Sequence, residues 1–224
     1  MNAEKVVAQM IERANAAFEP YLRQTHENFH RIGRLISASE AHNNEDILRS
    51  AVVFMHATLE DSLRSIASAF LPNANEAALN RIPLAGSSNS RPDKFLLGRL
   101  SAHRKRTVEE LIKKSVDEYL QHETFNSVSD IVELLHSLDF EIKPLESHFG
   151  SLDAMMKRRH QIVHCADREM DGKLVSINGD LVGSWVQTLI GFMGAVSAQV
   201  SNKNLILSAQ EVLRDVAKER GFDL

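Results

Sequence analysis

Residues 46–70, DILRSAVVFMHATLEDSLRSIASAF, carry the clearest structural signal in this chain of 224 residues. Apolar side chains recur along this stretch at steps of three and four residues, as they do on one face of an α-helix. These positions are Leu48, Val52, Met55, Leu59, Leu63, Ile66 and Phe70. The spacing predicts a long amphipathic helix that buries this stripe against neighbouring helices.

The segments on both sides of this stretch also have helical spacing. Residues 1–42 are expected to be helical, with an interruption or bend at Pro20, because proline lacks an N–H group and its ring disturbs the preceding turn. Further helices are expected over 93–103, 107–121 and 128–138, from about Ser151, and over 180–200 and 204–220. Alternating apolar residues flank only Asp171-Gly172, where a small hairpin is an alternative to a plain turn. The fold class is therefore expected to be all-α, an antiparallel helical bundle.

The length of the chain fits one domain with a sizeable core. This single domain, residues 1–224, is expected to comprise an N-terminal extension over 1–42, a core over 45–170 and C-terminal helices over 180–220. Residues 71–92 break the helical pattern with Pro72, Pro83 and the run Gly86-Ser-Ser-Asn-Ser. The sequence predicts a long loop there, and such a loop in a compact domain is either mobile or functional.

The composition is that of an ordinary globular protein, with 43% apolar and 25% charged residues. No run approaches the roughly 18 consecutive apolar residues of a membrane span, and the first twenty residues lack the apolar centre of a signal peptide. The one cysteine, Cys165, excludes an internal disulfide and fits a reducing compartment. A cytoplasmic protein without a membrane partner is expected.

The net charge of −4 argues against a protein that coats nucleic acid, although a local basic patch would suffice for a nuclease. Two basic clusters exist. The first extends over 91–114 and includes Arg99, Arg104, Lys105 and Arg106. The second consists of Lys157, Arg158, Arg159 and Arg168. The first cluster is either a solvated helix surface or a contact for an anionic partner.

The second cluster lies in the segment LDAMMKRRHQIVH, residues 152–164. Arg159 falls near the middle of the apolar face of this helix, where a guanidinium is costly unless it is paired or faces a wet cleft. His160 and His164 are one turn apart on a flank. On an ideal helix Arg159 and His164 diverge by roughly 140°. They would therefore meet only if the helix end distorts or a second protomer completes the site.

The residues RHQIVH, 159–164, resemble the signature of HEPN nucleases, in which an arginine is followed directly by a polar residue and, after a short spacer, by a histidine. Residues 56–63, HATLEDSL, resemble the first core helix of the RiboL-PSP-HEPN-like group of that superfamily. Residues 118–131 also look similar to this group. The resemblance covers roughly residues 45–170.

This resemblance implies cleavage of RNA without a metal or other cofactor, in a homodimer whose two motifs line one positively charged cleft. It implies that His164 is a general acid or base, a task that suits an imidazole at neutral pH. Arg159 would stabilise the charge that develops on the phosphoryl oxygens. His160 occupies the polar position after the arginine, and its role, orienting or protonic, stays open.

Two residues of the 46–70 helix are candidates for supporting roles. Glu60 is expected either to hold the guanidinium of Arg159 or to pair with Arg64 one turn later. His56 lies one turn before Glu60, and a histidine satisfied at the edge of the core is the favoured interpretation there. The candidate RNA contacts are Lys157, Arg158, Arg104, Lys105 and Arg106.

Other functions compete with the nuclease. The chain could be a non-catalytic HEPN module that binds RNA or a protein, or a ligand-sensing bundle. The pairs Glu27/His30 and Glu133/His136 have the spacing of di-iron ligands, but they face away from the apolar sides of their helices, so no metal site is expected. The role of a toxin or phage-defence effector, with an antitoxin or other defence partner, rests on the family resemblance alone.

Overall fold

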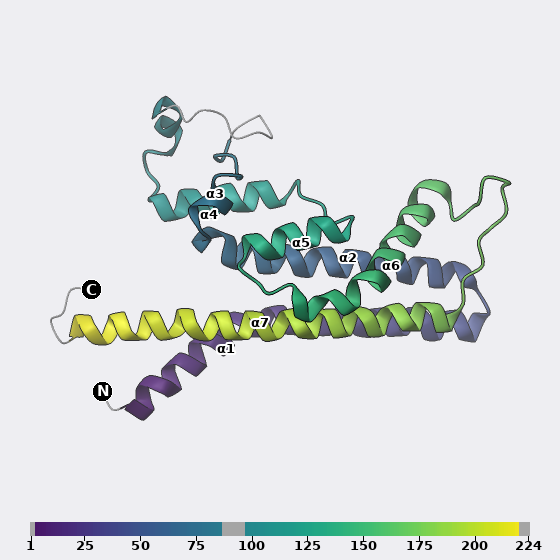
Figure 1. The fold of residues 1–224 in the computed structure, drawn as a ribbon, viewed down its shortest axis with the longest axis horizontal. Coiled ribbons are helices and arrows are strands. Elements are labelled where there is room, and N and C mark those ends of the chain that lie inside the picture. Colours follow the sequence, from purple (N-terminus) through teal and green to yellow (C-terminus); the bar gives the residue numbers. More distant parts are fainter. Residues whose placement is uncertain (1–2, 87–96, 220–224) are drawn as a thin grey trace. The chain divides into compact units, whose positions relative to one another are not determined.

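The computed structural model describes residues 3–86 and 97–219, and all regular elements within them are helices. This confirms the all-α prediction (Figure 1). The elements are α1 (Ala3–His42), α2 (Glu45–Phe70), η1 (Leu71–Asn73), α3 (Glu76–Leu79), η2 (Leu97–His103), α4 (Val108–Leu120), α5 (Val128–Ser137), η3 (Lys143–Leu145), α6 (Glu146–Cys165) and α7 (Gly179–Glu219).

The chain divides into two compact units. The first consists of Met1–Thr58 and Pro144–Leu224, and the second of Leu59–Lys143. Helix α2 therefore contributes its first half to one unit and its second half to the other. The division into two units does not test the expectation of a single domain, which stays a prediction.

The apolar stripe of α2 is buried along its whole length, as the spacing of three and four residues predicts. Each of the seven side chains in the stripe is at most 5% exposed. Removing an aliphatic or aromatic side chain of this size from water stabilises a fold by roughly 1.5–3 kcal/mol. The stripe therefore contributes to the cores of both units.

The first unit contains the two longest helices, α1 and α7, side by side and antiparallel (Figure 1). Arg13, near the start of α1, forms an ion pair of 3.1 Å with Asp215 near the end of α7. At the opposite ends, Gly179 lies beside Glu40. Helix α6 packs on α7, and a hydrogen bond of 2.9 Å joins Thr188 to Ser151.

The two longest helices are each continuous. Helix α1 passes through Pro20 without an interruption and changes direction along its length, in keeping with the alternative of a bend (Figure 1). Helix α7 continues through residues 201–204, where the sequence suggested a boundary between two helices. That segment contains neither proline nor glycine, and Val200, Ser208 and Val212 on either side of it are buried. Packing of α7 within the unit therefore overrides weak helix propensity.

Helix α7 is also apolar enough by length and composition to cross a membrane over Gly179–Asp215. The core helix of a soluble protein passes the same test. Part of the apolar surface is buried within the unit, including Leu189, Phe192 and Val196. The expectation of no membrane partner stays a prediction.

In the second unit, helices α4 and α5 begin with capping boxes. Thr107 and Glu110 satisfy each other's backbone N–H groups at the start of α4, and Ser127 and Asp130 do so at α5. These reciprocal caps fix the N-termini of both helices. Because each cap is formed by residues close in sequence, the predicted starts of the two helices lie close to the observed ones.

The predicted loop over 71–92 is partly helical. It contains the short helices η1 and α3, and the side chain of Asn75 caps α3 by accepting a hydrogen bond from the N–H of Ala78. Its last part, 87–92, lies outside the described residues. The helix expected over 93–103 is a 3-10 segment, Leu97–His103, within the described part of that range.

Helix α6 begins at Glu146, five residues before the expected start near Ser151. Pro144 does not delay it, because this proline lies in the 3-10 turn that leads directly into the helix. The helix ends at Cys165. The turn at Asp171-Gly172 forms as expected, but the hairpin is reduced to one antiparallel bridge between Arg168 and Leu174.

Candidate active site

The end of α6 positions the RHQIVH segment where the core ceases to cover the helix. Leu152, Met155 and Met156 are buried, whereas Val163 is 48% exposed. The segment is α-helical throughout, so no distortion brings Arg159 towards His164. The divergence of roughly 140° expected for five helical steps therefore applies.

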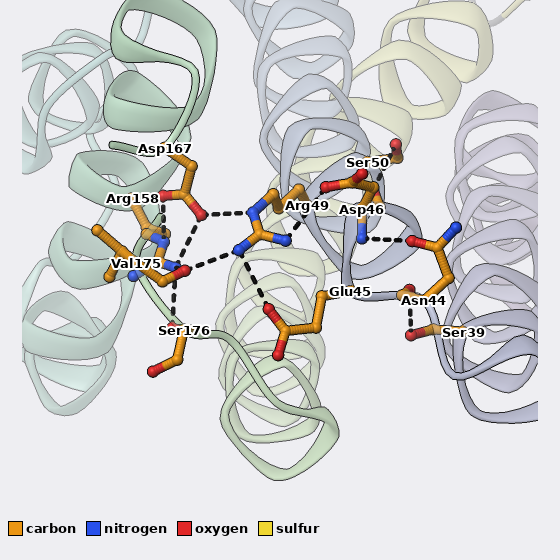
Figure 2. Close-up of polar contacts among 10 residues, drawn as sticks. All are labelled: Ser39, Asn44, Glu45, Asp46, Arg49, Ser50, Arg158, Asp167, Val175 and Ser176. Atoms are coloured by element: carbon orange, nitrogen blue, oxygen red, sulfur yellow. Dashed lines mark hydrogen bonds and ion pairs between the residues drawn. The ribbon is translucent and has the colours of Figure 1, made fainter. Parts of the chain in front are cut away.

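Arg158 is fixed inside the first unit (Figure 2). Its Nε and Nη2 lie 2.9 Å from Oδ1 and Oδ2 of Asp167, respectively. Nη2 also donates to the carbonyl oxygens of Val175 and Ser176, each at 3.0 Å. These contacts hold the guanidinium against the carboxylate and leave the side chain only 12% exposed. The expectation that Arg158 contacts RNA does not fit this placement.

Arg49, from the first turns of α2, binds the other side of the same carboxylate (Figure 2). Its Nε donates to Oδ2 of Asp167 at 2.6 Å, and its Nη2 donates to the carbonyl oxygen of Val175 at 2.7 Å. Glu45 and Asp46 each lie 3.2 Å from the guanidinium. Burial lowers the pKa of Arg49, but the hydrogen bonds to Asp167 and Glu45 outweigh it, so the pKa is raised above its usual value.

We call Arg49, Arg158 and Asp167 the clamp. The Asp167 side chain is fully buried between the two guanidinium groups. Arg49 and Asp167 are not predictable from sequence patterns, because 118 positions separate them and neither belongs to a recognisable motif. The only local signal was an acidic residue two positions after the end of the helix that carries the RHQIVH segment.

The clamp also determines where the motif helix ends. Ala166 and Asp167 have positive φ angles of 50° and 57°, in the left-handed region that residues other than glycine rarely adopt. Both backbone N–H groups donate to the carbonyl oxygen of Gln161. Because the Asp167 side chain is held from two sides, it stabilises this unfavourable backbone and fixes the last turn, which carries His164.

Arg159, the next residue after Arg158, has no such carboxylate partner. Its side chain is partly buried, and its Nε is shielded from solvent without a hydrogen-bond partner in the described part of the chain. No carboxylate among those residues forms an ion pair with it. A half-desolvated guanidinium without a counter-charge is costly, and an anionic ligand would relieve that cost.

His160 and His164 lie together on the exposed flank of α6. Their ring centroids are 4.5 Å apart, and both side chains are exposed to solvent. The exposed Cys165 follows directly. An acid–base role requires imidazoles that a substrate can reach, and both of these are accessible.

The remaining cations predicted to contact RNA are on the surface. Lys157 is exposed and forms an ion pair of 2.7 Å with Asp153. Arg104, Lys105 and Arg106 are exposed in the second unit, between η2 and α4. They stay candidates for RNA contact. The side chain of Arg99 lies outside what the structure describes.

The two predicted supporting residues have partners of their own or are buried. Glu60 accepts a hydrogen bond from the N–H of Phe125 at 3.1 Å and lies 3.5 Å from Nη2 of Arg64. The Arg64 alternative is thus the one observed. His56 is 1% exposed, so it lies inside the core rather than at its edge. Within the described ranges, no group of three or more His, Cys, Asp or Glu side chains is placed to hold a metal ion.

Comparison with known proteins gives one match. The family model described as RiboL-PSP-HEPN matches residues 24–202, most of the chain. The matched region includes the clamp and the RHQIVH segment, and it extends into α1 and α7, beyond the resemblance seen over residues 45–170. No curated protein and no solved structure matches the chain.

Proposed function

The chain belongs to the RiboL-PSP-HEPN family, and from this premise we propose that it is a metal-independent endoribonuclease that acts as a homodimer. One observation carries the proposal. A guanidinium without a counter-charge, Arg159, and a solvent-exposed imidazole, His164, occupy the last turns of one helix.

The proposed reaction is attack of a ribose 2′-OH on the adjacent phosphorus. The 2′-oxygen forms a bond to phosphorus as the bond to the 5′-oxygen breaks, which gives a 2′,3′-cyclic phosphate and a 5′-hydroxyl end. An imidazole removes the 2′-OH proton, and a protonated imidazole supplies a proton to the leaving 5′-oxygen. At each composite site one His164 serves both steps, first as the base and then, protonated, as the acid, and Arg159 stabilises the negative charge on the phosphoryl oxygens.

The divergence of Arg159 and His164 along a regular helix supports a composite site. Arg159 would act together with His164 of the partner subunit, so that one phosphate contacts both groups. Exposed apolar side chains beside the motif support a protein contact there: Val163 is 48% exposed, Leu174 47%, and Met170 is fully exposed. Apolar groups of this kind are enriched in the centres of homodimer interfaces.

The first test is to incubate the purified protein with RNA in excess chelator. We expect cleavage that yields 2′,3′-cyclic phosphate and 5′-hydroxyl ends, and its loss in Arg159→Ala and His164→Ala. Circular dichroism and thermal melting establish that both variants fold. Failure of the wild-type protein to cut any RNA would count against the proposal.

The second test is to mix the two inactive variants. In a heterodimer of Arg159→Ala and His164→Ala, one composite site keeps both intact groups and the other keeps neither. Random reassortment of a two-fold dimer then predicts recovery of about a quarter of wild-type activity. No recovery, with heterodimers demonstrated, would show that each site is built within one subunit.

A non-catalytic HEPN module is the second candidate, because the apolar residues beside the motif would also suit another protein. In that case His164→Ala would leave RNA or partner binding unchanged. The proposed role as a toxin or defence effector in the cytoplasm, with an antitoxin or other defence partner, is supported by family membership alone.

A further inference from the structure

A groove of about 650 Å³ lies in the first unit and is lined by residues of α1, α2 and α6. Its lining includes apolar side chains such as Val53, Phe54 and Ile162, together with three arginines. Ile162 belongs to the RHQIVH segment. One wall of the groove is therefore the helix that carries the candidate active site.

The arginines give the groove a positive charge, and no aspartate or glutamate lines it. Arg49 is balanced by the clamp and by Glu45. Arg31 and Arg34, by contrast, are exposed and have no carboxylate partner within the described residues. In a chain with a net charge of −4, this local excess of positive charge favours an anionic ligand.

Arg31 is held in a defined position. Its guanidinium carbon lies 4.2 Å from the centroid of the Phe54 ring, and its Nη1 donates to Oδ1 of Asn28 at 3.2 Å. A guanidinium stacked on an aromatic ring keeps free donors for a phosphate and presents a planar surface on which a nucleobase can stack.

The groove and Arg159 share one side of α6, whereas His160 and His164 lie nearly opposite Ile162, two residues away on the helix. Ile162 follows Arg159 by three residues, which places the two side chains about 60° apart around the helix and one turn apart along it. An extended ligand in the groove would therefore reach the unpaired guanidinium of Arg159.

We propose that this groove binds a single-stranded segment of RNA beside the cleavage site. Arg34 and Arg31 contact successive phosphates, and one base stacks on the Arg31–Phe54 pair. The inference rests on the proposed ribonuclease function. It commits to RNA rather than to an acidic peptide, because the cations surround a stacking surface and the groove adjoins Arg159.

The test measures binding separately from cleavage. A fluorescent single-stranded RNA is titrated against the His164→Ala protein at several salt concentrations, and the same protein then receives Arg31→Ala and Arg34→Ala together. We expect about tenfold weaker binding or more, and a slope of log Kd against log salt that is smaller by about 1.4, or 0.7 for each lost phosphate contact. Phe54→Leu should weaken binding about fivefold through lost stacking without a change in this slope.

The matched control removes two charges elsewhere in the same unit. Arg13 and Arg214 are exposed and lie outside the groove lining. Arg13→Ala with Arg214→Ala should change the affinity by less than about twofold, because only long-range, salt-screened attraction is lost. An equal loss of affinity in the control and in the groove variant would overturn the proposal.

The outcomes separate this inference from the proposed function. If the wild-type protein cuts RNA but the groove variant binds as tightly as its parent, the groove proposal is wrong and the ribonuclease stands. If RNA binds through Arg31 and Arg34 but is never cut, the groove stands and the ribonuclease fails. A labelled polyglutamate peptide that binds as tightly as RNA, with the same dependence on both arginines, would make the groove a protein-docking site and overturn the inference.

Discussion

Arg158 and Arg159 are neighbours on one helix, yet their surroundings are opposite. Arg158 forms an ion pair with a buried carboxylate and donates to two backbone carbonyl groups (Figure 2). Arg159 is partly buried, and no carboxylate in the described part of the protein forms an ion pair with it. The adjacent residues point about 100° apart, which is enough to place them in different environments.

Residues that stabilise the fold and residues proposed to act on RNA therefore lie side by side at the end of α6. The clamp holds the loop after α6 and the end of the helix in place. The motif residues gain nothing comparable from the fold, and the cost of an unpaired guanidinium there is of the kind that functional sites tolerate. Substitutions in the clamp should therefore lower stability, and substitutions in the motif should lower RNA cleavage. Four experiments test this distinction.

The largest effect is expected at His164. His164→Ala should reduce RNA cleavage by about 10²–10⁴-fold, because it removes the proposed acid–base group. The free energy of unfolding should change by less than about 0.5 kcal/mol, since the side chain is exposed. The matched control is His122→Ala, an exposed histidine of the second unit. Equal activity of the two variants would remove His164 from the mechanism.

Asp167→Ala should give the largest loss of stability. It leaves two buried guanidinium groups without their shared carboxylate, which should lower the free energy of unfolding by about 3–5 kcal/mol in urea denaturation. Asp153→Ala removes an exposed carboxylate from the same region and should cost less than about 1 kcal/mol. A loss at Asp167 no larger than that at Asp153 would contradict the description of the clamp.

The neighbouring arginines should show opposite responses when each is changed to methionine. Arg158→Met should lower the free energy of unfolding by about 2–4 kcal/mol, because buried acceptors lose their donor. Arg159→Met should leave the stability within about 1 kcal/mol and reduce cleavage by about 10²–10³-fold. Urea denaturation and a cleavage assay on both proteins measure the two responses. If both variants lose stability equally, the contrast between the two residues is wrong.

The smallest effect is expected for Arg49→Lys. Lysine keeps the positive charge near Asp167 but cannot reproduce the forked contacts to the carboxylate and to the carbonyl of Val175. A loss of about 1–2 kcal/mol in urea denaturation is expected from the missing hydrogen bonds. A variant as stable as the wild type would mean that charge alone holds the clamp together.

Much of the fold was predictable because its signals are local. The stripe of α2 and the capping boxes of α4 and α5 depend on residues within one or two turns, and the structure contains these helices within a residue or two of the prediction. Prediction failed where packing decides. Helix α7 passes through residues 201–204, where a boundary was expected, because buried residues on either side of that segment pack within the unit.

The sequence by itself determined the helices and the position of a guanidinium and two imidazoles at the end of one of them, because helical geometry follows from neighbouring residues. Only the tertiary structure decided which arginine is used internally and which is left open to a ligand. That choice depends on Asp167 and Arg49, which are 118 positions apart and meet only after α2 and α6 have packed. No periodicity or spacing encodes such a contact.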